Sequence, residues 1–187
     1  MSEAKAFIEQ TGIEDLLIIH PRVFADERGY FYESYNKERF AEHGIHHDFV
    51  QDNQARSTYG ILRGLHFQHA PYAQTKLVRV MEGEVLDVVV DLRWESETYG
   101  KSYSIVLSEE NKTQFLIPKG FAHGYAVLSP TAVFQYKCDN YYSKAHECGL
   151  AYNDPALGID WKIPAKDIIT SERDEKWTGF KDLIHNF

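Results

Sequence analysis

The chain has 187 residues, enough for one domain, and its 43% hydrophobic and 14% aromatic content is typical of a globular protein. A formal net charge of −8 argues against nucleic-acid or anionic-membrane binding, which needs a basic face. No apolar run is long enough to span a membrane, and Met1–Gln10 lacks the apolar core of a signal peptide. Cys138 and Cys148 have neither metal nor redox spacing. We expect a single cytoplasmic domain over residues 1–187, with no nucleic-acid or membrane partner.

Short strands separated by turn residues dominate the chain. In chain order, the expected strands are Leu16–Ile19, Tyr30–Tyr35, Lys76–Val80, Val85–Leu92, Tyr103–Leu107, Thr113–Ile117, Tyr125–Leu128 and Ala132–Tyr136. The pattern at Lys37–Glu42 predicts a short helix that ends before Gly44. Residues 163–187 are expected to form peripheral helix and coil. Val85–Val90 is almost continuously apolar, as in a strand buried on both faces. The pattern predicts an all-β sandwich or barrel of the jelly-roll class with a few short peripheral helices.

Arg63 and His66 stand three residues apart on either side of Gly64. Extended backbone would alternate the directions of these side chains, but a glycine permits a bend. Taken alone, the two residues could be a surface arginine and a core histidine. Lys76, His123, Tyr136 and Tyr142 follow on other strands, and such groups often converge inside one barrel. The sequence therefore favours a polar site in the interior.

The segment Ile117–Gly124 resembles the second signature motif of the cupin superfamily, with Pro, Gly and His at the same spacing. In metal cupins this histidine is a metal ligand, together with two histidines and an acidic residue of the first motif. Here the first motif offers His66 and Gln68 in place of His-x-His, and Lys76 where the acidic ligand should fall. A protonated lysine cannot bind a divalent metal, and two histidines are too few for a typical site. We expect no metal and no cofactor, which leaves an organic acid–base site.

Blocks along nearly the whole chain resemble the dTDP-4-dehydrorhamnose 3,5-epimerase family, whose members act in activated L-rhamnose synthesis. In chain order, the matching blocks are Phe24–Glu33, Phe49–Asn53, Leu62–Gln68, Lys76–Val78, Asp87–Arg93, Ile117–Gly124, Tyr136, Tyr141–Ser143, Asn153–Pro155 and Ser171–Asp174. The resemblance implies a cupin-type jelly-roll barrel. It also implies an isomerase whose substrate is a dTDP-linked 4-keto-6-deoxy sugar.

The resemblance assigns roles position by position. His66 would be the catalytic base and Asp174 its orienting carboxylate, with Tyr136 as the proton donor on the opposite face and Lys76 near the ketone oxygen. Tyr142 would stack on the thymine ring. Further substrate contacts would come from Arg28, Phe31, Glu33, Gln51, Asp52, Asn53, Arg63, His123, Glu147 and Arg173. Because Arg28 and Glu33 reach a neighbouring subunit's site in the family, a homodimer is implied, with region 1–45 contributing to it.

Three positions depart from the family pattern. Tyr152 stands where Trp is usual, Arg173 where Lys is common, and Trp177 near a usual Pro. The last departure predicts a different course for the C-terminal tail. None of the three removes a group that the chemistry needs.

The expected chemistry begins with loss of a proton from a carbon next to a ketone. This step needs a base on one face, a cation at the enolate oxygen and an acid on the opposite face. His66, Lys76 and Tyr136 suit these roles, although Lys76 could be an edge-strand charge, Tyr136 ordinary core and Asp174 a helix cap. We expect inversion at C3 and C5 of dTDP-4-keto-6-deoxy-D-glucose. The alternatives are a C3-only or other deoxysugar-nucleotide epimerase, and a cupin that binds a nucleotide sugar without catalysis.

Overall fold

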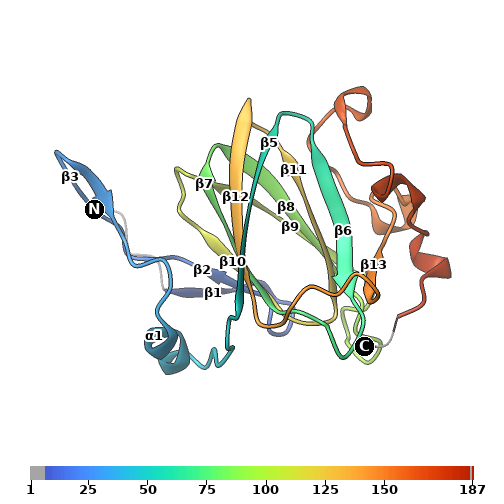
Figure 1. Cartoon of the computed structure of the whole chain (residues 1–187), viewed down its shortest axis with the longest axis horizontal. Coiled ribbons are helices and arrows are strands. Elements are labelled where there is room, and N and C mark those ends of the chain that lie inside the picture. The colour runs from blue at the N-terminus through green and yellow to red at the C-terminus, as the bar shows by residue number, and fades with distance from the viewer. Residues whose placement is uncertain (1–6, 186) are drawn as a thin grey trace.

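Two antiparallel β-sheets face each other in the structure, a computed structural model that describes residues 7–185 and residue 187 (Figure 1). One sheet has six strands, in the spatial order β1 (Ile8–Gln10), β2 (Leu17–Ile19), β10 (Gln114–Ile117), β7 (Lys76–Glu82), β12 (Thr131–Cys138) and β5 (Gln51–Thr58). The other has five, in the order β13 (Glu147–Gly149), β6 (Leu62–Gln68), β11 (Phe121–Val127), β8 (Glu84–Asp91) and β9 (Ser102–Ser108). The all-β jelly-roll class is therefore confirmed. The expectation for residues 1–6 lies outside the described residues.

The strand β8 shows how the core is divided. Val85 and Val89 point into the space between the sheets, where they pack with Phe115, Phe134 and other buried residues. The alternate side chains of β8 point to the outer face, which the C-terminal segment covers. Since both faces are buried, the strand needs no polar alternation, and the prediction from Val85–Val90 is confirmed.

The helix α1 (Lys37–Glu42) has the predicted bounds. The Asn36 side chain caps it by accepting hydrogen bonds from the backbone N–H groups of Glu38 and Arg39. Its buried residue, Phe40, packs on Ile19 and Leu116 of the six-stranded sheet. The helix therefore covers part of the outer face of this sheet.

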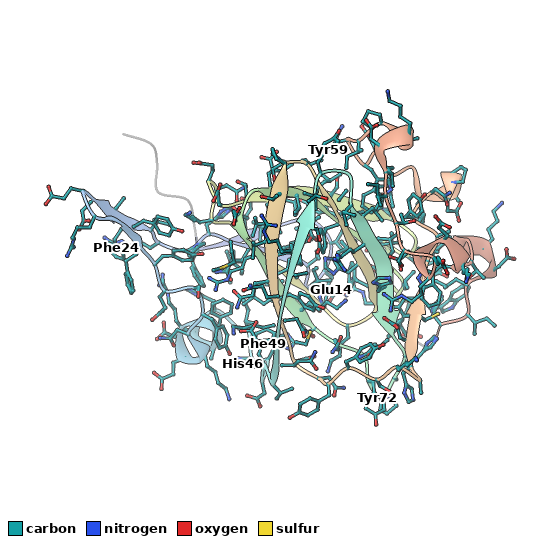
Figure 2. The ribbon with its side chains drawn as sticks, turned by 45° about the horizontal axis from the view of Figure 1, so that its top comes forward. Glu14, Phe24, His46, Phe49, Tyr59 and Tyr72 are labelled. Carbon is teal, nitrogen blue, oxygen red and sulfur yellow. The ribbon has the colours of Figure 1, made fainter. Side chains whose placement is uncertain are left out.

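A small hairpin of β3 (Phe24–Asp26) and β4 (Gly29–Phe31) projects away from both sheets (Figure 1). Its aromatic side chains are exposed, Phe31 to 70%, and Phe24 lies far from the side chains that fill the sandwich (Figure 2). The expected strand Tyr30–Tyr35 was wrong beyond Phe31. The chain leaves the hairpin there and is held to the outer face of the six-stranded sheet by side chains: Arg79 donates to the Tyr32 hydroxyl, and Gln114 to the Ser34 carbonyl.

The C-terminal segment packs against the five-stranded sheet in short 3₁₀ turns (Figure 1). These turns are η1 (Pro155–Leu157), η2 (Ala165–Asp167), η3 (Asp174–Lys176) and η4 (Phe180–Asp182). Just after η3, the Trp177 ring lies directly over Gly149 of β13, where an added Cβ would come within 2.4 Å of the ring. This contact fixes the tail beside β6 and β13. Within the described ranges, no helix is both long and apolar enough to cross a bilayer.

Candidate active site

A cavity of about 420 Å³ lies inside the sandwich, between β6 and β11 of one sheet and β7 and β12 of the other. Tyr59, in the turn between β5 and β6, and Tyr72, between β6 and β7, mark opposite ends of the sandwich (Figure 2). Nine of the residues expected in the site line this cavity: Arg63, His66, Lys76, His123, Tyr136, Tyr142, Glu147, Arg173 and Asp174. The structure thus brings together groups from both sheets and from the C-terminal segment.

A local irregularity in β6 points both Arg63 and His66 into the cavity. Opposite them on β11, His123 pairs with His66 and Tyr125 with Arg63, so three steps along β6 match two along β11. Gly64 makes this possible with φ of 132°, and an added Cβ there would lie 2.5 Å from the Cα of Gly124. The bend expected at Gly64 is therefore present, and only glycine fits it.

His66 is paired with Asp174, 108 residues further along the chain. Its Nε2 lies 2.7 Å from Asp174 Oδ1, and the carboxylate side chain is only 3% exposed. Burial alone would raise the pKa of Asp174, but the bond from His66, the Gly64 amide and the Arg173 charge together hold that pKa below its usual value. A carboxylate in this place fixes the ring and stabilises its protonated form.

Lys76 and Tyr136 stand on neighbouring strands of the opposite sheet. Lys76 pairs with Cys138 in the register of β7 and β12, so it lies one inward-facing position from Tyr136. Burial lowers the pKa of Lys76, and the nearby Cys138, Asp87 and Glu147 oppose this shift. Burial raises the pKa of Tyr136 to about 12, so its hydroxyl keeps its proton at neutral pH. The pair presents an amino group and a hydroxyl proton donor to the cavity.

A second histidine–carboxylate pair, which the sequence analysis did not identify, lies at the cavity wall. His123 Nε2 is 3.0 and 3.1 Å from the two oxygens of Asp87, and both side chains are buried. Burial lowers the pKa of His123 and raises that of Asp87. The missed signal was a single carboxylate within the apolar run of β8, because a lone charge in a fully buried strand needs a partner.

At one end of the cavity, Tyr142 stands beside a pair of opposite charges. Its hydroxyl donates to Glu147 Oε2 at 3.0 Å, and Arg173 Nη1 lies 2.9 Å from both Glu147 oxygens. Gln68, also missed as a site residue, holds this segment by accepting from the Ser143 amide and donating to the Tyr141 carbonyl. The exposed Tyr142 ring is thus presented by a fixed loop.

Other expected contacts lie off the cavity in the single chain. Gln51 and Asn53 occupy the inner face of β5 beside it, bonded to each other. Asp52 points to the outer face, where it binds Lys137 at 2.9 Å. Three further expected residues are exposed and do not line the cavity: Arg28, Phe31 and Glu33.

The residues present do not assemble a metal site. His66 and His123 are neighbours, but Gln68 and Lys76 occupy the places where metal cupins have ligands. Across residues 7–185 and 187, no group of three His, Cys, Asp or Glu side chains could hold an ion.

Epimerisation next to a carbonyl requires a base, a cation and an opposing acid, and this interior supplies candidates for each from two facing sheets. The class of protein is a cupin-type isomerase that works by acid–base chemistry. Comparison with known proteins makes the assignment specific.

The family model of dTDP-4-dehydrorhamnose 3,5-epimerase matches residues 10–182. The enzyme of that name from Escherichia coli is 51% identical over 177 residues, 94% of this chain and 95% of its own. The crystal structure of the Elizabethkingia anophelis enzyme shares 56% identity with a TM-score of 0.90, covering 94% of this chain and 96% of its own. A dTDP-6-deoxy-D-glucose-3,5-epimerase from Legionella pneumophila, solved with dTDP-4-keto-L-rhamnose, shares 47% identity with a TM-score of 0.91, covering 95% and 94%. The chain belongs to the dTDP-4-dehydrorhamnose 3,5-epimerase family.

Proposed function

We propose that the protein converts dTDP-4-keto-6-deoxy-D-glucose to dTDP-4-keto-L-rhamnose by inverting C3 and C5, without metal or cofactor. The observation that carries the proposal is one cavity lined by His66 of the five-stranded sheet, its partner Asp174 from the C-terminal segment, and Tyr136 and Lys76 of the six-stranded sheet. The family and the product-bound relative support the substrate.

Each inversion is a proton removal followed by a proton return. His66 takes the proton from the carbon next to the ketone, and the electron pair moves onto the ketone oxygen, where Lys76 stabilises the enolate. Tyr136 then gives its proton to the same carbon from the opposite face. The cycle leaves a protonated His66 and a Tyr136 tyrosinate. Before the next inversion, His66 gives its proton to solvent and Tyr136 takes one from solvent. Solvent hydrogen is therefore incorporated at each inverted carbon.

The nucleotide would be held at the ends of the cavity. Tyr142 offers an exposed ring for stacking on thymine, and Arg63, bonded to Ser57 through Nε, keeps its remaining N–H groups for the pyrophosphate. Glu147 and Arg173 lie beside Tyr142, and His123, which lines the cavity, would contact the sugar.

The working form would be a homodimer in the cytoplasm. The hairpin of β3 and β4 carries exposed aromatic rings and unpaired strand edges, features that commonly mark an interface. Through this hairpin, Arg28, Phe31 and Glu33 of one subunit would complete the cavity of the other. Free thiols at Cys138 and Cys148 suit a reducing compartment.

The test is incubation with dTDP-4-keto-6-deoxyglucose in deuterated water, followed by NMR. The proposal expects deuterium at both C3 and C5 and the L-rhamno product. Exchange at C3 alone would establish the monoepimerase alternative. Tight binding without exchange at either carbon would show a non-catalytic binder, and the proposal would be abandoned.

A further inference from the structure

We propose that Arg173 is a positioning residue for the catalytic base: its charge keeps the His66 ring in the neutral form that can accept a proton, and Glu147 holds it in place. The inference rests on the proposed role of His66 and adds a role for Arg173 beyond substrate contact.

The guanidinium of Arg173 touches both carboxylates around the base. Nη1 lies 2.9 Å from each oxygen of Glu147, and Nε lies 3.5 Å from Asp174 Oδ1. Its Nη2 is 3.5 Å from His66 Nε2. Because that ring nitrogen lies 2.7 Å from Asp174, its hydrogen points to the carboxylate, and the guanidinium acts on the ring as a nearby positive charge.

The electrostatic balance around His66 explains why such a charge is useful. A carboxylate beside an imidazole favours the protonated ring, which cannot accept a further proton. A cation on the same side opposes this effect. The charged or titratable groups that line the cavity with the ring are Asp174 and Arg173 from the C-terminal segment, Glu147 from β13, Tyr142 from the loop before it, Arg63 from β6, His123 and Tyr125 from β11, Lys76 from β7 and Tyr136 from β12, with Asp87 of β8 behind His123.

The planar fork of Arg173 reaches Glu147, Asp174 and the ring together, which holds its charge near the ring. Arg173 is half exposed, but Glu147 is only 15% exposed and fixes one end of the fork. The guanidinium therefore stays beside the ring.

The experiment compares Arg173→Gln, which removes the charge, with Arg173→Lys, which keeps the charge without the fork. Deuterium exchange at C3 and C5 is followed from pH 5 to 8 at saturating substrate. Arg173→Gln is expected to move the acid limb of the rate profile upward by about half a unit to one unit, the size of one unit charge about 4 Å away in a solvated site. Arg173→Lys should leave the limb near its wild-type position. Lys176→Gln, the same charge loss at an exposed position of η3, is the matched control and should not move it.

Titration of the His66 ring by NMR, in the protein without substrate, gives a readout independent of activity. The ring signal of Arg173→Gln should titrate at higher pH than that of wild type by the same amount. If both acid limbs and both NMR titrations coincide, and Arg173→Gln only raises KM, Arg173 is a substrate contact and the inference is wrong. If wild type itself fails to exchange, the proposed function fails instead.

Discussion

Asp174→Asn is the sharpest test of the catalytic pair, because it changes a charge and almost no volume. Asp174 is 3% exposed and accepts from His66 at 2.7 Å, so an amide oxygen can take its place in the same space. In the variant, the ring that becomes protonated during proton removal donates to a neutral amide oxygen instead of a carboxylate, so the charge-assisted part of the bond is lost. Hydrogen bonds to charged groups contribute about 1.5–3 kcal/mol, which corresponds to about 10- to 160-fold in rate.

The assay is the initial rate of deuterium exchange at C3 and C5, measured with the KM for the substrate. The expected variant exchanges about 10- to 160-fold more slowly at saturation, with KM changed much less. Thermal unfolding of Asp174→Asn establishes that the sandwich is intact. A folded variant that exchanges within twofold of wild type would refute the reasoning, since the carboxylate would then contribute nothing to the charged state of His66.

Four further predictions follow from the site and the fold. His66→Asn should reduce exchange and inversion alike by about 10²–10⁴-fold, whereas Tyr136→Phe should reduce inversion by a similar factor and exchange by less. Deuterium NMR measures exchange and inversion separately. Activity should survive prolonged chelation, and loss with EDTA that one divalent ion restores would contradict this. Sedimentation should give about twice the 21.6 kDa chain mass, and Arg28→Ala should raise KM; a fully active monomer would exclude the shared site. Burial would raise the pKa of Asp91, but hydrogen bonds from Arg93, Thr98 and Ser96 hold that pKa below its usual value. The ionised Asp91 therefore stabilises the fold fully above its unfolded pKa, and this contribution is lost as the pH falls through the folded pKa. Urea unfolding between pH 2 and 6 should show that Asp91→Asn removes this pH dependence of stability.

Much of the fold was predictable, because buried strands need apolar residues. The strand β8 and the capped helix α1 both followed from such patterns. The strand β5 was missed since its inner face meets the polar site and its outer face meets water, which leaves no apolar alternation in Gln51–Thr58. The exposed hairpin gave the opposite error: its aromatic residues predicted a strand to Tyr35, but β4 ends at Phe31.

The site was predictable in part for similar reasons. The glycine between Arg63 and His66 indicated that the strand could bend there, and the structure contains the bend. The approach of Asp174 to His66 spans 108 residues and depends on how the tail packs, so no local pattern reveals it; only the family resemblance did. Asp87 was visible in the sequence, but its meaning depended on knowing that His123 faces it.

The contact of Trp177 with Gly149 has a genetic consequence. A side chain at position 149 would collide with the indole and push the tail outward, and Asp174 lies three residues before that indole. Gly149→Ala would therefore score in a selection as a loss of catalysis, although it alters no reacting group. A smaller residue at position 177 would be recovered as its suppressor, because it returns the space that the methyl group took.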